Sequence, residues 1–95
     1  MRATNRELLL RGILRESIDK LNKAIASEEK IIELSQQMDF RNYGKVDPSK
    51  YIKLQLIIND LTNRRAPYML KLAEIDEKIE DEINLLEEKD GNNDR

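Results

Sequence analysis

The sequence predicts an all-α protein: two long helices that pack antiparallel as a hairpin. From Tyr51 to Leu86, apolar residues recur at alternating spacings of three and four, which keeps one stripe of a helix against a partner. A single strong break, at residues 42–47, divides the 95 residues into two arms of similar length. The composition is 38% charged and 4% aromatic, which suits long exposed helices better than a sheet protein.

The first helix is expected over residues 4–41. Thr4 and Glu7 have the spacing of a capping box, in which the hydroxyl and the carboxylate each bind a free backbone amide. An apolar stripe then follows from Leu10 to Ile25. After Ile25 the pattern shifts to another face of the helix, and we interpret this as a local irregularity of the heptad. The apolar residues after the shift are Ile31, Ile32, Leu34 and Met38.

Residues 42–47 are expected to form the turn between the helices. Gly44 can adopt the left-handed conformation that closes a helix. Asp47 followed by Pro48 is a helix start signal, an N-cap carboxylate before a proline in the first turn. Because this linker is short, the two helices should lie side by side and antiparallel.

The second helix is expected over residues 48–88, with a kink near Pro67. An interior proline removes one backbone hydrogen bond and clashes with the preceding turn, at a cost of about 3 kcal/mol. The apolar spacing nevertheless continues across Pro67, which favours one kinked helix over two shorter ones. The prediction is therefore a single domain over residues 1–89, followed by a frayed tail at 90–95.

Two charged residues, Arg65 and Glu82, interrupt the stripe of the second helix. Polar residues in a helical seam can set register and oligomeric state. With a turn near residues 42–47, Arg65 is expected opposite residues 24–28, which makes Glu28 its candidate partner. We therefore predict a register-setting polar seam of Glu28, Arg65 and Glu82.

Charge is distributed unevenly along the chain. Residues 1–25 carry six basic and three acidic side chains, a net charge of +3, whereas residues 71–95 carry four and ten, a net charge of −6. Antiparallel packing places these segments beside each other. A hairpin this small leaves much apolar surface exposed, so we expect it to dimerise into a four-helix bundle or coiled coil.

Composition excludes several kinds of site. The chain has no cysteine and no histidine, which removes disulfides, thiolate nucleophiles and the commonest general base and metal ligand. We predict no catalytic residue, no cofactor and no metal ion; the acidic residues at 74–82 are expected to form a solvated helix face. No apolar run is long enough for a membrane span and no signal-peptide core is present, so we expect a cytoplasmic protein.

Basic and aromatic side chains gather at the expected tip of the hairpin. They could close the end of the bundle, dock a protein partner, or grip phosphates and stack on bases. A net charge of −2 provides no broad basic field, which disfavours nucleic acid. The candidate partner-contact residues are Arg41, Tyr43, Lys45, Lys50, Tyr51 and Lys53.

The segment Leu34–Asp39, with the sequence Leu-Ser-Gln-Gln-Met-Asp, resembles the Ser-Gln-x-Leu-Asp signature of small helical-hairpin aspartyl-phosphate phosphatases that regulate sporulation. In that family the motif lies on the second helix and contacts a phosphorylated response regulator. The resemblance implies that Gln36 and Asp39 are the working residues of such a phosphatase.

The function that the sequence favours is that of a non-catalytic helical module for protein–protein interaction. Such a module would be an adaptor, an inhibitor or an assembly factor, of the kind that phages and other mobile elements encode. The phosphatase and a nucleic-acid-binding protein that uses the hairpin tip are the alternatives.

Overall fold

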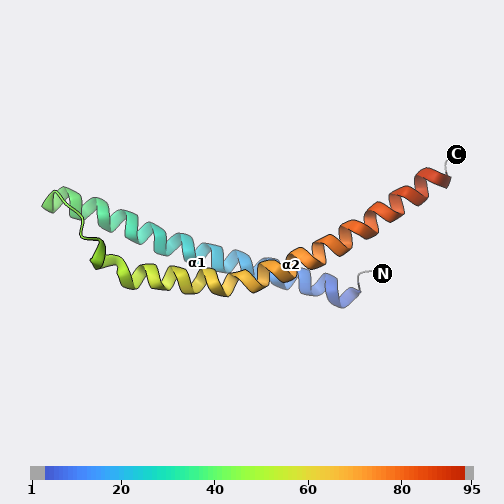
Figure 1. The fold of residues 1–95 in the computed structure, drawn as a ribbon, viewed down its shortest axis with the longest axis horizontal. Coiled ribbons are helices and arrows are strands. Elements are labelled where there is room, and N and C mark those ends of the chain that lie inside the picture. Colours follow the sequence, from blue (N-terminus) through green and yellow to red (C-terminus); the bar gives the residue numbers. More distant parts are fainter. Residues whose placement is uncertain (1–3, 94–95) are drawn as a thin grey trace.

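The computed structural model describes the backbone of residues 4–93 and the side chains of residues 4–87. It contains α1 (Asn5–Tyr43), a short 3₁₀ helix η1 (Pro48–Tyr51) and α2 (Ile52–Asn93). The helices α1 and α2 run antiparallel and pack together along a rod of 73 × 26 × 15 Å (Figure 1). The predicted all-helical hairpin is confirmed, and residues 4–93 include no strand.

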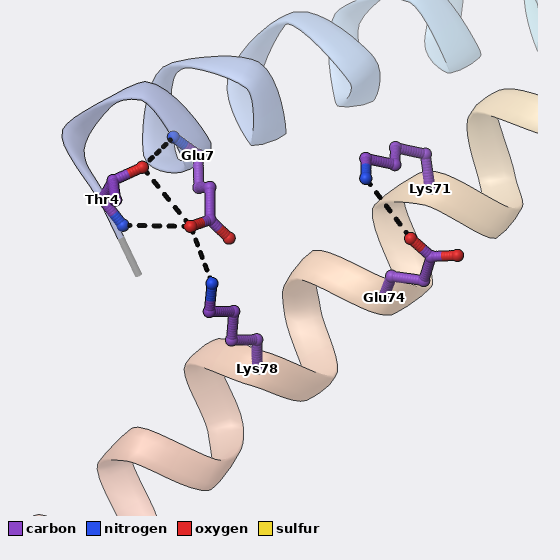
Figure 2. A network of polar contacts seen from close by, with 5 residues as sticks. All are labelled: Thr4, Glu7, Lys71, Glu74 and Lys78. Carbon is purple, nitrogen blue, oxygen red and sulfur yellow. Dashed lines mark hydrogen bonds and ion pairs between the residues drawn. The ribbon is translucent and has the colours of Figure 1, made fainter. Parts of the chain in front are cut away.

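The helix α1 begins where the sequence predicts, because a capping box forms at Thr4. The Thr4 Oγ1 accepts a hydrogen bond from the Glu7 amide at 3.1 Å, and the Thr4 amide donates to Glu7 Oε1 at 3.3 Å. Figure 2 shows that the same carboxylate oxygen also accepts from the Lys78 Nζ of α2, at 2.8 Å. These donors, Lys78 above all, hold the pKa of Glu7 below its ordinary value. One side chain therefore both caps α1 and ties it to α2.

The helix α1 ends at Gly44, whose φ of 69° lies in the left-handed region that strains any residue with a Cβ. The Gly44 amide donates to the Phe40 carbonyl at 2.8 Å and closes the last turn. Because α1 continues through Tyr43, the turn is shorter than the predicted 42–47.

The second arm begins with the predicted Asp-Pro signal. The Asp47 side chain accepts a hydrogen bond from the Ser49 amide at 3.1 Å, as an N-cap does. The first turn is η1, a 3₁₀ turn, and α2 follows directly. The helix then continues to Asn93, so residues 90–93 of the predicted frayed tail are helical; Asp94 and Arg95 lie outside the described residues. A single glycine at 91 costs about 1 kcal/mol, too little to end a helix.

The hydrophobic core is a narrow seam between the two helices. Five side chains are buried, and no polar side chain among the described residues is buried with them. The predicted stripe of the second arm is buried or half-buried from Tyr51 to Glu82 except at Tyr68, while Leu86 is exposed. The buried residues are Leu14, Ile25, Ile32, Tyr51 and Ile75.

The predicted change of face in α1 does not occur. The residues Ile31, Leu34 and Met38 are 47–61% exposed, whereas the packed face continues straight through Ile32 to half-buried polar residues. The reason is that α2 follows the same side of α1 along the whole hairpin. The position of α2 therefore determines which face of α1 is buried. The half-buried polar residues of that face are Glu28, Ser35 and Asp39.

The helix α2 is continuous through Pro67. Figure 1 shows α2 bending along the yellow-to-orange stretch that contains this residue. Pro67 cannot donate to the Asn63 carbonyl, but both residues are exposed, so water can satisfy that carbonyl. The structure therefore has one long helix here rather than two shorter ones.

The two helices do not end together. Lys78 contacts Glu7, so in this register Glu80 lies across from Asn5, the first residue of α1. Residues 81–93 consequently extend beyond α1, and Figure 1 shows the orange-to-red end of α2 running past the start of α1 and away from it. We call residues 81–93 the overhang; at 1.5 Å per residue it is about 20 Å long.

Candidate interaction surfaces

The hairpin tip is held by one carboxylate, that of Asp39 on α1. Lys50 Nζ donates to its two oxygens at 2.9 and 3.0 Å, and the Tyr51 hydroxyl donates to Asp39 Oδ2. The Tyr51 ring is 4% exposed, which makes it one of the five core residues. Two of the predicted contact residues, Lys50 and Tyr51, therefore join α1 to the start of the second arm.

The other four predicted tip residues remain on the surface. Arg41, Tyr43, Lys45 and Lys53 are all exposed, and Tyr43 is 72% exposed. Arg41 also lines an open hollow of about 660 Å³ beside the tip. The remaining lining residues of this hollow are Glu33, Gln36, Gln37, Phe40 and Val46.

The Asp39 cluster predicts a defined pH dependence of stability. Hydrogen bonds from Tyr51 and Lys50 hold the Asp39 pKa below its ordinary 3.8, and the bond to Asp39 raises the pKa of Tyr51 above 10.0. The stabilisation that corresponds to the lowered carboxyl pKa is fully present above pH 3.8 and is lost as the pH falls through the pKa of the folded state. The stabilisation that corresponds to the raised phenol pKa is fully present below pH 10.0 and is lost as the pH rises through the pKa of the folded state. We expect the melting temperature of Asp39→Asn to lie below that of the wild type between these limits.

Thermal melts of the two proteins from pH 2 to 11 measure this difference. It should shrink at both extremes, because one partner of the cluster changes charge at each end. Asp60→Asn is the matched control, since Asp60 is exposed and, among the described residues, pairs only with Arg64 one turn away, at 3.1 Å. A constant difference across the whole range would contradict the role of Asp39.

The polar seam residues are placed differently from the prediction. Arg65 is half-buried and its Nη1 donates to Asn22 Oδ1 at 2.7 Å, so its partner is Asn22 rather than Glu28. The tight turn at Gly44 sets a register in which Arg65 lies nearer to Asn22. Glu28 is half-buried without a hydrogen bond or ion pair among those of the described residues. Glu82 is half-buried, and its Oε1 has no donor in the described part of the chain.

The charged ends of the chain meet as the antiparallel arrangement predicts. The Arg11 Nε lies 2.9 Å from Asp76 Oδ1, and Arg15 Nη2 lies 3.6 Å from the same oxygen. Both pairs join the basic first segment to the acidic last one. They are partly exposed, so each contributes less than about 1 kcal/mol, and their main effect is on the choice of antiparallel packing.

An apolar patch covers one face of the hairpin near the tip. Ile31 and Met38 are seven residues apart on α1, and Leu34 lies between them, so the three share a face. On α2, Ile57 is 45% exposed and lies seven residues before Arg64. Arg64 and Ser17 line one hollow, so they lie on the same side of the hairpin. Ser17 lies fourteen residues before Ile31 on the same face of α1. Ile57 and Ile31 therefore lie on that side as well. We call Ile31, Leu34, Met38 and Ile57 the tip patch.

Sequence reasoning missed this patch because it assigned the α1 residues to the core. One signal separates them from it. Leu14, Ile18, Leu21, Ile25 and Ile32 continue a single 3-4 spacing. Ile31, Leu34 and Met38 are offset from that spacing and form a second stripe.

The segment that resembles the phosphatase signature lies on α1, near its end. Asp39 faces the second arm and is held by Lys50 and Tyr51, while Gln36 is half-buried beside the tip hollow. The two residues that the resemblance selects thus belong to different surroundings, and only Gln36 borders an open surface.

No family model, curated protein or solved structure matches the chain. Within the described residues, neither helix has an apolar stretch that could cross a lipid bilayer. The side chains of that same part of the chain include no group of three acidic residues placed to share a metal ion.

Proposed function

We propose that this protein is a non-catalytic module for protein–protein interaction, which uses the tip patch to bind a helix of a partner protein. As an adaptor, inhibitor or assembly factor, the protein would act by binding and covering that helix of the partner. The single observation that carries the proposal is the excess of exposed over buried apolar side chains. Among the described residues, seventeen large apolar side chains are exposed and five are buried.

An excess of this kind has an energetic consequence. Each square ångström of apolar surface removed from water contributes about 25 cal/mol, so a hairpin that leaves most of its large apolar residues exposed gains stability from any surface that covers them. Scattered exposed residues are ordinary, but the tip patch is contiguous by spacing on two adjacent helices. A contiguous patch indicates a specific contact.

The shape of the tip patch favours a helix as its occupant. Ile31, Leu34 and Met38 follow the 3-4 spacing of a coiled-coil seam, which fits the side chains of a third helix. Asp39, Lys50 and Tyr51 brace the same end of the hairpin, so the patch is presented on a rigid support. The exposed cations Arg41 and Lys53 lie close along the chain to the tip patch, Arg41 three residues after Met38 and Lys53 four residues before Ile57. They would favour a partner with acidic residues beside its apolar stripe.

The test has two steps. A photo-crosslinking amino acid at Leu34 captures the partner in cells that produce the protein, and the same amino acid at Lys23 is the control, because Lys23 is exposed on the outer side of α1. The captured protein is then purified and titrated against the wild type and the double variant Leu34→Glu/Met38→Glu. We expect the double variant to bind at least tenfold more weakly, about 1.4 kcal/mol or more, because its charges would be buried in the interface.

Two results would overturn the proposal. One is equal crosslinking from Leu34 and Lys23, which indicates capture without specificity. The other is unchanged affinity of the double variant for the purified partner, with circular dichroism showing that the hairpin is intact.

A further inference from the structure

The overhang is the one part of the described chain that leaves the hairpin. Its exposed apolar side chains Ile83, Leu85 and Leu86 are 49, 57 and 57% exposed. Ile83 and Leu86 are three residues apart and share a helix face. Residues 81–93 carry five acidic side chains and one basic side chain, a net charge of −4. The overhang is therefore an acidic amphipathic helix with an uncovered apolar side.

The open half of the hairpin, residues 5–25 of α1 and 64–78 of α2, has the opposite charge. Residues 5–25 carry five basic and three acidic side chains, and residues 64–78 carry four and three, which together make a net charge of +3. This half also contains a hollow of about 490 Å³ with apolar and basic side chains on its rim. The lining residues are Ser17, Lys20, Leu21, Arg64, Pro67 and Tyr68.

We propose that the overhang of one copy packs as a third helix on the open half of a second copy, and that the second copy's overhang does the same in return. The result is a symmetric dimer joined at the open ends of two hairpins. This proposal rests on the proposed function as an interaction module, but the dimer uses a surface separate from the tip patch. The partner is therefore a second copy of this chain, which carries both members of the complementary pair.

The lengths of the two surfaces agree. Ser17 lies twelve residues after Asn5, so the hollow begins about 18 Å from the start of α1 at 1.5 Å per residue. The overhang is about 20 Å long. An overhang laid along α1 from Asn5 thus reaches the near edge of the hollow, at Ser17. Two-fold symmetry doubles each contact, so a charge of −4 meets a charge of +3 twice in one dimer.

The cations of the hollow already have partners, and this does not prevent the contact. Arg64 pairs with Asp60 at 3.1 Å and Lys20 with Glu16 at 3.6 Å, both one helical turn apart and both more than half exposed. Exposed pairs of this kind contribute little to stability. Arg6, at the start of the same surface, is also exposed.

Sedimentation velocity of the full chain at 5–200 µM tests the proposal. We expect the wild type to form a dimer and Ile83→Glu/Leu86→Glu to be a monomer, with a dissociation constant raised at least tenfold. Ile31→Glu/Leu34→Glu is the matched control. It places the same two charges at exposed apolar positions of the tip half and should leave the dimer intact.

A charge exchange tests the pairing itself. Asp81→Lys/Glu87→Lys reverses charges in the overhang, and Arg6→Glu/Lys20→Glu reverses charges on the open half; all four side chains are exposed. Each variant alone should be weakened as a dimer. Their equimolar mixture should form a heterodimer. In it the unchanged overhang, with a net charge of −4, meets the unchanged open half, with a net charge of +3, while the altered overhang and the altered open half carry net charges of 0 and −1 and do not repel each other.

The proposal is overturned by a wild-type monomer at 200 µM or by a dimer that survives Ile83→Glu/Leu86→Glu. It is also overturned if the equimolar mixture of the two charge variants does not form a heterodimer. A dimer lost in Ile31→Glu/Leu34→Glu instead assigns self-association to the tip patch. The partner titration with the tip variants reports separately on the proposed function. The two failures are therefore distinguishable.

Discussion

Replacing Ile75 with alanine is expected to lower the free energy of unfolding by about 2 kcal/mol, at the low end of the range for buried isoleucine. Ile75 is 3% exposed, the lowest value among the buried apolar side chains of the described residues. It lies on α2 next to Asp76, which pairs with Arg11 across the seam. Because the core is only one seam wide, water can reach part of the cavity that the substitution leaves. This is why the expected effect is not larger.

Urea unfolding followed by circular dichroism measures the effect, at a fixed protein concentration because self-association adds to apparent stability. Ile57→Ala is the matched control: it makes the same substitution on the same helix at a residue that is 45% exposed. Its effect should remain within about 0.5 kcal/mol. Equal losses for the two variants would show that the seam is not the stabilising core.

Replacing Pro67 with alanine is expected to raise the free energy of unfolding by about 2 kcal/mol. Proline inside a helix costs about 3 kcal/mol, and its stiffening of the unfolded chain returns up to about 1 kcal/mol. Pro67 is exposed and α2 is already helical on both sides of it, so alanine can restore the hydrogen bond to the Asn63 carbonyl without repacking the seam.

The same variant should straighten α2. Spin labels at the exposed residues Gln55 and Leu85 report the distance across the bend, which should increase in Pro67→Ala. Ala73→Pro provides the reciprocal control, because a second proline at an exposed position should destabilise the helix by about 3 kcal/mol. A drop in stability of Pro67→Ala would mean that the bend is needed to pack the open half of the hairpin.

Much of the fold follows from signals that act within one helical turn. Thr4 with Glu7 starts α1, Gly44 ends it, and Asp47 with Pro48 starts the second arm. Each signal satisfies backbone groups through atoms two to four residues away, so no knowledge of the partner helix is needed. The end of α2 was predicted too early, since the sequence near residue 90 has no stop signal stronger than one glycine.

The candidate surfaces were predicted less completely. The structure brings the candidate residues together at the tip, and two of them, Lys50 and Tyr51, also bind Asp39 of α1. The tip patch was assigned to the core because Ile31, Leu34 and Met38 are apolar and periodic. Periodicity shows that residues share a face, but it does not show which face the other helix covers.

The two-helix hairpin, its turn and the packed stripe of α2 were thus readable from local chemistry and spacing alone. The tertiary structure decided which face of α1 is buried beyond Ile25, that Arg65 meets Asn22, and that the overhang extends past the start of α1. These features depend on the register between helices of about forty residues each. The register is determined by the sum of many weak contacts between residues distant in the chain. A shift of a few residues in the turn changes every cross-helix pair.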